Sequence, residues 1–330
     1  MADAKTSVGV WGTGSVGLRH LEVFRSIGAE VHAIPTRPER RASLESAGWR
    51  VADSFEAAMA RGVRAFVVAT NTARHADDAA RALEAGCDVL IEKPLAVDLA
   101  SARRILAASA KDAIAAVGCN LRFTRGLTCF REQLARVGRV HAVDVECRSY
   151  LPDWRPSTDH RASYSARGEE GGVIRDLIHD IDYTTWCFGQ PTAVIATLDN
   201  LRMLGISSEE IATLAWRSPA GAHVNIRLDY LTRPARRRMT AFGAEGTLEW
   251  DAIAQTVVFT ASAGARESWD VTEPRNAAYE RQALDFISGV TGRTRSSQAA
   301  GLLDGAAALA VCDAARSSSA SGCTHSVDSL

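Results

Sequence analysis

The chain of 330 residues lacks several features that mark whole classes of protein. No stretch approaches the roughly 18 consecutive apolar residues that a membrane span needs. The N-terminus carries no basic region followed by an apolar core, so no secretory signal is expected. Because the net charge is only −1, nothing favours nucleic acid or an anionic membrane surface. We therefore expect neither kind of partner.

The cysteines are too scattered for a metal site or a disulfide framework. Their number is odd, and none stands in a CxxC pair. This usage is typical of a reducing compartment, so we expect a cytoplasmic protein without a bound metal. The seven positions are Cys87, Cys119, Cys129, Cys147, Cys187, Cys312 and Cys323.

What the chain does contain is an ordinary balance of 46% apolar and 23% charged residues, over a length that suits about two domains. In the first part, short apolar runs alternate with helical periodicity, which predicts a parallel sheet with right-handed crossovers. The expected strands are 8–11, 30–34, 64–70, 89–92 and 113–119, and the expected helices are 16–27, 73–85 and 99–110.

After a predicted helix at 128–137 the pattern changes to alternating runs, which predict a mainly antiparallel sheet. A polar and aromatic loop, 151–170, and a helix at 172–187 interrupt these strands, and two helices at 279–290 and 299–315 follow them. The prediction is thus α/β plus α+β. The expected domains are 1–121, which holds the parallel sheet, and 122–316, which holds the antiparallel sheet, with a disordered tail at 317–330.

A glycine motif, GTGSVG, follows the first predicted strand and opens a helix. Gly12 permits the tight turn, Gly14 lets the backbone approach a pyrophosphate, and Gly17 allows close packing of helix and strand. Amide groups at the helix start, at Ser15 and Val16, then hold the phosphates. The alternative is a glycine-containing turn without a ligand.

The end of the second strand discriminates NAD from NADP, because an acid binds the ribose 2′-hydroxyl whereas an arginine accommodates a 2′-phosphate. Here Thr36 and Arg37 stand at that position, with no acid at the strand end. We expect them to bind the phosphate and therefore favour NADP over NAD. In the alternative these arginines are solvated and the enzyme uses NAD.

Two short segments carry groups suited to proton transfer, Glu92-Lys93-Pro94 and the run from Asp176 to Asp182. Oxidising a secondary alcohol requires loss of the hydroxyl proton, and Lys93 and His179 are candidates to take it. Asp176, three residues before His179 on the predicted helix, faces the same side and is a third catalytic candidate. Asp182 could anchor the imidazole. The alternatives are a surface histidine, an ordinary strand-end lysine, or a metal site on this helix.

The loop after residue 150 mixes aromatic and charged side chains. Aromatic rings stack on sugar faces, and arginines bind carboxylates or phosphates. An oligomer contact is the alternative, because the same residue types are favoured at interfaces. The predicted substrate-binding residues are Tyr150, Trp154, Arg155, Arg161, Tyr164, Asp176 and His179.

These motifs together resemble the Gfo/Idh/MocA oxidoreductase family over roughly residues 6–316. The resemblance rests on the glycine motif, on HADDAARALEAGCDVLIEKP at 75–94, on NLRF at 120–123 and on GGVIRDLIHDID at 171–182. It implies a Rossmann domain followed by an open-faced antiparallel sheet. It also implies hydride transfer at a ring carbon of a sugar, nucleotide sugar, aminosugar or cyclitol.

The resemblance also implies roles for single residues. Lys93 would be the active-site lysine, before a cis proline, and His179 the acid/base. Further residues would lie near the nicotinamide or the substrate, and they are Thr70, Asn71, His75, Glu92, Lys93, Asn120 and Arg122. The chain departs from the family in two places: the usual Thr-Pro is replaced by Asn71-Thr72, and Asp176 lies three rather than four residues before His179.

From these observations we expect an NADP- or NAD-dependent oxidoreductase, forming a homodimer or homotetramer through the C-terminal sheet. Three alternatives stay open at this point. They are an imine reductase, a lyase or epimerase that oxidises its substrate transiently, and a regulator that senses a dinucleotide without catalysis.

Overall fold

The computed structural model describes residues 6–168 and 170–330, which form two compact units. Unit 1 contains the described residues up to Phe123 together with Pro274–Ala306, and unit 2 contains Thr124–Glu273 and Ala307–Leu330. Residues 1–5 of the first predicted domain and residue 169 of the predicted loop 151–170 lie outside the described residues.

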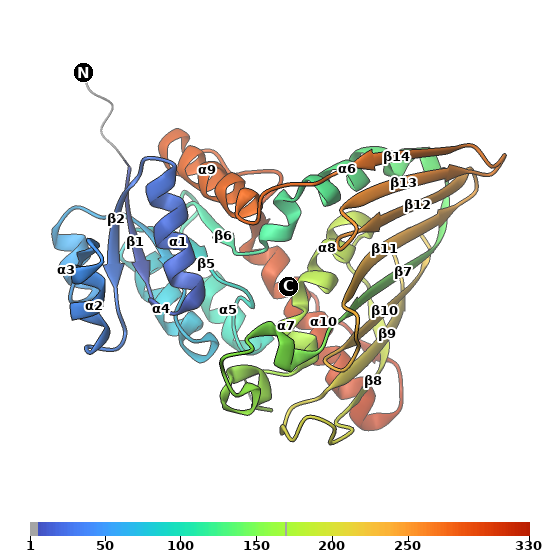
Figure 1. Cartoon of the computed structure of the whole chain (residues 1–330), viewed down its shortest axis with the longest axis horizontal. Coiled ribbons are helices and arrows are strands. Elements are labelled where there is room, and N and C mark those ends of the chain that lie inside the picture. The colour runs from blue at the N-terminus through green and yellow to red at the C-terminus, as the bar shows by residue number, and fades with distance from the viewer. Residues whose placement is uncertain (1–5, 169) are drawn as a thin grey trace. The chain divides into compact units, whose positions relative to one another are not determined.

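Unit 1 is built on a seven-stranded sheet in the order β15-β6-β5-β4-β1-β2-β3. Figure 1 labels β1, β2, β5 and β6 of this sheet. All of its strands are parallel except β15, so the order is that of a Rossmann sheet with one added edge strand. The strands are β1 Ser7–Trp11, β2 Glu30–Ile34, β3 Arg50–Val51, β4 Ala65–Val68, β5 Asp88–Ile91, β6 Ala115–Val117 and β15 Ala300–Gly301.

Apolar periodicity explains how helices cover this sheet. In α1, Leu21 and Phe24 fall on one face and are fully buried, and the Phe24 ring meets Phe286 of α9 edge-on with centroids 6.4 Å apart. The helices of unit 1 are α1 Ser15–Ser26, α2 Arg40–Ser46, α3 Phe55–Ala60, α4 Thr72–Glu84, α5 Leu99–Ala108, the 3₁₀ turn η1 Asn120–Phe123 and α9 Ala277–Gly292.

The predicted domain boundary needs correction, because residues 274–306 return to unit 1 rather than to the second domain. Phe286 of α9 packs into the core of the parallel sheet, and β15 pairs with β6. A local pattern cannot show this return, since it records that a segment is apolar but not which core the segment fills. The first unit also runs to Phe123 instead of ending at residue 121.

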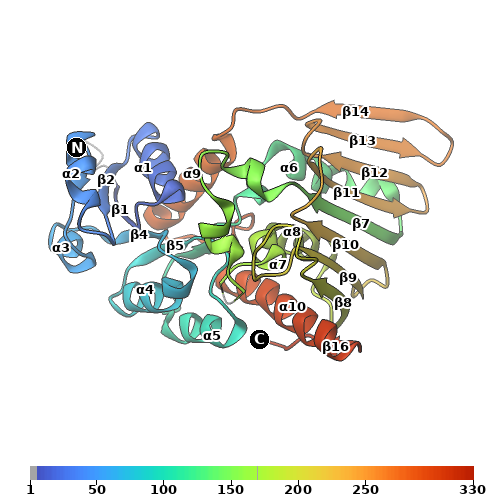
Figure 2. The same ribbon diagram turned by 60° about the horizontal axis from the view of Figure 1, so that its bottom comes forward.

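Unit 2 is built on a nine-stranded, mainly antiparallel sheet in the order β14-β13-β12-β11-β7-β10-β9-β8-β16 (Figure 2). The exception is the parallel pairing of β7 with β10. The strands are β7 Val140–Arg148, β8 Ala193–Asp199, β9 Ile211–Arg217, β10 His223–Asp229, β11 Arg236–Gly243, β12 Gly246–Asp251, β13 Thr256–Ala261, β14 Arg266–Asp270 and β16 His325–Ser326.

One face of this sheet lies under helices, and its strands alternate accordingly: along β10, Ile226 and Leu228 are buried, whereas Asn225 and Arg227 are exposed. The helical segments of unit 2 are α6 Arg125–Gln133, η2 Leu134–Val137, η3 Leu151–Trp154, η4 His160–Ala162, η5 Tyr164–Ala166, α7 Val173–Asp176, α8 Ile178–Phe188 and most of α10, Leu302–Ser321.

The helix predicted at 172–187 is in fact two helices, α7 and α8. The backbone of Leu177, with φ −96° and ψ 24°, leaves the helical region between them. Asp176 therefore ends one helix, while His179 and Asp182 belong to the next. The expectation that all three lie on one helix face was wrong for Asp176.

The tail predicted to be disordered, 317–330, is structured. Helix α10 continues to Ser321, and β16 pairs with β8. Ser318 Oγ accepts a hydrogen bond from the Ala196 amide at 2.9 Å, and Ser319 Oγ accepts one from the Leu198 amide at 2.8 Å. The serine-rich composition suggested disorder, but these hydroxyls satisfy β8 and so fix the segment. Among the described helices, none is long and apolar enough to cross a membrane.

Candidate active site

A cavity of about 270 Å³ opens at the carboxyl ends of β1, β2 and β4. This is the point where the strand order of a doubly wound sheet reverses, and where such sheets bind ligands. Six of its lining residues were predicted, and Thr13 and Ala69 were missed because only their position in space marks them. The lining residues are Gly12, Thr13, Gly14, Thr36, Arg37, Ala69, Thr70 and Asn71.

The three glycines differ in their local geometry. Gly12 has φ +98°, and a Cβ there would lie 2.3 Å from the Ala69 oxygen. A Cβ at Gly17 would lie 1.9 Å from the Gly12 oxygen, so only glycine lets α1 approach the loop. A Cβ at Gly14 would meet nothing within 4 Å, and Gly14 gives α1 no side-chain cap. Open space beside uncapped helix amides fits a dinucleotide pyrophosphate.

The wall of the cavity after β2 is basic. Thr36 and Arg37 are both exposed and line the cavity. Arg40, at the start of α2, donates from Nη2 to the Thr13 oxygen at 3.0 Å, which brings a second guanidinium to the glycine loop. No acidic residue occurs from 35 to 38. This wall can neutralise a phosphate but offers no carboxylate to a ribose 2′-hydroxyl.

Glu92, directly after β5, is a buried carboxylate with two partners. His20 of α1 donates from Nε2 to Oε1 at 2.6 Å, and the Lys93 amide donates to Oε2 at 3.2 Å. Burial raises the pKa of Glu92, but the hydrogen bond and charge of His20, with Lys93 and His75, lower it overall. Glu92 is therefore ionised at neutral pH. His20 was not predicted from the sequence, because it lies 72 positions before Glu92 in the chain and no local pattern connects the two.

His75 was predicted to bind the cofactor, but it is 2% exposed and is not among the residues that line the cavity. Its Nδ1 lies 2.8 Å from the Pro94 oxygen and its Nε2 lies 3.1 Å from the Thr70 oxygen. Burial lowers its pKa against the opposing effect of these two carbonyls. His75 thus stands behind the cavity wall and links it to the turn that carries Lys93.

Three further predicted residues of unit 1 follow β5 and β6: Lys93 comes after β5, and Asn120 and Arg122 belong to η1. Lys93 is half-buried, and its bond to Pro94 is cis, as the resemblance implied. Asn120 is buried. Arg122 is only 2% exposed, and its Nη1 lies 3.4 Å from Asp304 Oδ2 at the start of α10. This ion pair gives Arg122 a structural partner within unit 1.

In unit 2, Asp176 is held by two phenols, those of the buried Tyr230 and the half-buried Tyr164. Tyr230 donates to Oδ2 at 2.6 Å, and Tyr164 also hydrogen-bonds to this carboxylate. Burial, together with the negative charge of Asp176, raises the pKa of both tyrosines well above the ordinary value. Both phenols therefore stay protonated and act as donors. Asp176 connects the predicted substrate loop at Tyr164 with the end of β10 at Tyr230.

His179 is half-buried on α8, and the residue after it anchors that helix. Asp180 is fully buried and accepts hydrogen bonds from Arg237 Nη2 of β11, at 3.0 Å, and from the Tyr183 hydroxyl. Removing one partner of a buried pair like this typically costs about 3–5 kcal/mol. The ion pair fixes α8 against the sheet and so fixes the backbone of His179.

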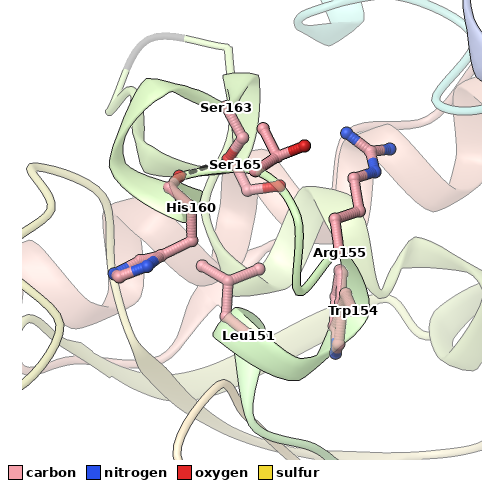
Figure 3. A pocket seen from close by; sticks show the side chains of 7 residues that line it. Leu151, Trp154, Arg155, His160, Ser163 and Ser165 are labelled. Carbon is pink, nitrogen blue, oxygen red and sulfur yellow. Dashed lines mark hydrogen bonds between the residues drawn. The ribbon is translucent and has the colours of Figure 1, made fainter.

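The predicted substrate loop encloses only a small cavity, of about 20 Å³, which has room for about one water molecule. In Figure 3 the His160 ring and the Arg155 guanidinium extend to opposite sides of it, and Ser163 Oγ donates to the His160 oxygen at 2.6 Å. Trp154 lines this cavity, packs edge-on against Tyr230 and donates from Nε1 to Ser149 Oγ at 2.9 Å. Trp154 as a whole is 39% exposed, so part of it stays open to solvent.

Two other predicted substrate residues, Arg161 and Tyr150, each contact a charged side chain. Arg161 forms a bidentate ion pair with Asp159, with Nε and Nη2 at 3.0 Å from the carboxylate oxygens. The Arg233 guanidinium lies 3.5 Å from the centre of the Tyr150 ring. Neither residue lines the small cavity. Among the described residues, no group of three or more His, Cys, Asp or Glu side chains is arranged to hold a metal ion.

Comparison with known proteins matches two family models. Residues 6–118 match the oxidoreductase family with an NAD-binding Rossmann fold, and residues 133–249 match the GFO/IDH/MocA C-terminal domain. The chain belongs to the GFO/IDH/MocA family of oxidoreductases. The predicted fold class, a Rossmann domain followed by a mainly antiparallel sheet domain, is thereby confirmed.

Individual relatives agree with this assignment. The chain is 31% identical to inositol 2-dehydrogenase of Rhizobium meliloti over 57% of each chain. It is 26% identical to inositol 2-dehydrogenase of Rubrobacter xylanophilus over 99% of this chain and 94% of the relative. Levoglucosan dehydrogenase, solved in complex with NADH, has the same fold, with a TM-score of 0.89 at 17% identity over 99% of this chain and 100% of that one. Some alignments thus span little more than half of the relative.

The buried Glu92 carboxylate should make stability depend on pH. Its pKa is lower in the folded state than the ordinary 4.5, so it stabilises the fold above about pH 4.5, and this contribution is lost as pH falls through the folded pKa. We expect Glu92→Gln to lower the free energy of unfolding by about 1–3 kcal/mol at pH 7. The difference from wild type should shrink below about pH 4.5.

Urea unfolding at a series of pH values measures this. Glu84→Gln, at the exposed end of α4, is the control and should change little at any pH. A stability loss for Glu92→Gln that stays constant from pH 3 to pH 7 would contradict the interpretation.

Proposed function

We propose that the protein transfers hydride between NADP or NAD and a secondary hydroxyl or ketone of a sugar, nucleotide sugar, aminosugar or cyclitol. The observation that carries the proposal is the position of His75, which contacts Thr70 in the cavity wall and Pro94 next to Lys93. One imidazole thus links the cavity that fits a dinucleotide to the turn that bears an amine. When bound, the nicotinamide supplies or accepts the hydride.

The protein's own part in this reaction is to move a proton. A hydroxyl that loses hydride must also lose its proton, and a carbonyl that gains hydride must gain one. We assign this transfer to Lys93 in unit 1 and to His179 in unit 2. We assign Asp176 to holding Tyr164 and Tyr230, since both phenols already donate to its carboxylate.

The substrate class draws support from the relatives. The names of two of them are inositol 2-dehydrogenase and, in Ensifer adhaerens, 1,5-anhydro-D-fructose reductase. The first name denotes an enzyme that oxidises a polyhydroxylated ring compound, and the second an enzyme that reduces a ketone of such a compound. The open part of the Trp154 ring, fixed by Tyr230 and Ser149, suits the apolar face of such a ring.

Lys93→Ala and His179→Ala should each lower turnover by about 10²–10⁴-fold while binding of the dinucleotide persists, because each removes a proton-transfer group and leaves the cavity wall intact. Turnover is followed by the absorbance of the reduced nicotinamide with a panel of sugars and cyclitols. Lys111→Ala and His223→Ala, both at exposed positions, are the matched controls. Near-normal turnover of either test variant would refute the role assigned to that residue.

We further propose that NADP is preferred over NAD, because Thr36 and Arg37 line the cavity without a neighbouring acid. Arg37→Ala should weaken NADPH binding by about 10-fold or more, the usual effect of losing a charge-assisted contact, and leave NADH binding within about 2-fold. Fluorescence titration measures both. Arg50→Ala, an exposed cation on β3, is the control. Tighter binding of NADH than NADPH by the wild type would overturn the preference.

We also propose a homodimer or homotetramer that assembles through the exposed face of the unit 2 sheet. On this face Arg238, Glu146 and Arg227 stand in register across β11, β7 and β10, and the buried Asp251 of β12 pairs with Arg238 at the end of the row. Their charges alternate in sign, so a two-fold axis can bring opposite charges together. A cytoplasmic location is proposed with it, since all seven cysteines are free thiols.

Arg227→Glu places an acid directly beside Glu146, so that two like charges stand next to each other on the proposed interface. Their repulsion should weaken the assembly. The expected result is a shift toward the monomer mass in size-exclusion chromatography with light scattering. Arg266→Glu on the edge strand β14 is the control and should keep the wild-type mass. An unchanged mass for Arg227→Glu would count against this face as the interface.

A further inference from the structure

Two buried histidines of unit 1 hold the Glu92-Lys93-Pro94 turn from opposite sides. His20 is 1% exposed and comes from α1, the helix that begins at the glycine loop. His75 is 2% exposed and comes from α4, which begins directly after Asn71, another residue that lines the cavity. Neither is among the residues that line the cavity. Their positions suit them to hold other groups rather than to touch a ligand.

The contact of His20 reaches Lys93 through one carboxylate. Glu92 Oε1 accepts the His20 hydrogen bond at 2.6 Å, and Oε2 accepts the Lys93 amide at 3.2 Å. Glu92 has little room to move, because a Cβ at Gly118 would already lie 3.1 Å from its Oε1. On the other side His20 meets the Tyr279 ring edge-on, with centroids 5.5 Å apart. The carboxylate therefore links α1, through His20, to the backbone of Lys93.

The contacts of His75 act on the residue after Lys93. Its two ring nitrogens lie within hydrogen-bond distance of two backbone oxygens, those of Pro94 and Thr70. Thr70 lines the cavity, so this imidazole sets the spacing between the cavity wall and the far end of the turn. Together the two histidines fix the residues immediately before and after Lys93.

We propose that His20 and His75 are positioning residues that clamp the Glu92-Lys93-Pro94 turn to the two walls of the dinucleotide cavity and so set the direction in which the Lys93 side chain extends. This inference rests on the proposed function, in which Lys93 transfers a proton beside the bound dinucleotide. A displacement of about 1 Å at such a group can cost about 10²-fold in rate. The clamp accounts for two imidazoles in places where apolar side chains would fill the same space.

The test uses the scarcity of lysine in this chain, which has only Lys5, Lys93 and Lys111. Full-length protein labelled with [ε-¹³C]lysine gives three ε-methylene resonances, and Lys93→Arg assigns the one of interest. His20→Leu and His75→Leu remove the hydrogen bonds while keeping a similar volume. His20→Gln and His75→Gln keep a donor of similar reach. Each variant is compared with wild type under the same conditions.

We expect both leucine variants to shift or broaden the Lys93 resonance, to leave that of Lys111 unchanged, and to lose about 10–100-fold in kcat with the KM for the dinucleotide within about 3-fold. Both glutamine variants should restore the resonance and most of kcat. If leucine and glutamine variants behave alike, the histidines serve packing only and the clamp is refuted. A Lys93 resonance that stays at its wild-type position in both leucine variants also refutes it.

If a leucine variant fails to fold, Glu92→Ala breaks the link to His20 from its other end and keeps both histidines. It should perturb Lys93 in the same way, and an unperturbed Lys93 resonance would again refute the clamp. The two proposals fail separately. A responsive Lys93 resonance without turnover of any sugar or cyclitol rejects the proposed function and keeps the clamp. Turnover of a sugar or cyclitol together with a Lys93 resonance that the substitutions leave unchanged keeps the proposed function and rejects the clamp.

Discussion

Glu92 brings a negative charge to the end of a central strand of the parallel sheet, where it is 7% exposed. An unpartnered carboxylate there would become protonated or would disrupt the fold. The chain meets this constraint with one imidazole, one backbone amide and the nearby charge of Lys93. Because these partners come from α1 and from the turn itself, satisfying the charge also determines where the turn lies relative to the glycine loop.

The order of the strands explains where the cavity lies. In a sheet ordered 6-5-4-1-2-3 the crossovers diverge between β1 and β4, and the loops at their carboxyl ends separate. Gly12 is compressed against Ala69 at this point, while Gly14 remains open. The shape of the cavity therefore depends on the topology of the sheet and on these glycines, whereas its basic character comes from Arg37 and Arg40.

Most of unit 1 could be predicted because its signals are local. Glycines between strand and helix, and apolar runs of four or five residues, predict most residues that line the cavity at the carboxyl ends of β1, β2 and β4, including Thr36 and Arg37. Contacts between distant residues could not be predicted in this way. His20 and Glu92 are 72 residues apart, and no spacing rule connects them.

In unit 2 the strands were predictable from their alternation, but three features depended on tertiary context. The break at Leu177 places Asp176 on its own short helix, where two tyrosines bind it. The return of 274–306 to unit 1 depends on which core Phe286 enters. The serine-rich tail is ordered only because its hydroxyls meet unpaired amides of β8. In each case the local sequence is compatible with more than one structure, and contacts with distant residues determine which one forms.

That last feature has a consequence for solubility in the cell. A nine-stranded sheet ends in two strands whose free amides and carbonyls could recruit further chains without limit. Along β8 the outward amides of Ala196 and Leu198 are capped by serine hydroxyls, and β16 pairs with the residues before them. The other edge, β14, carries the charged residues Arg266, Glu267 and Asp270. Because both edges are protected against further strand pairing, the sheet can leave one face uncovered without becoming a template for aggregates.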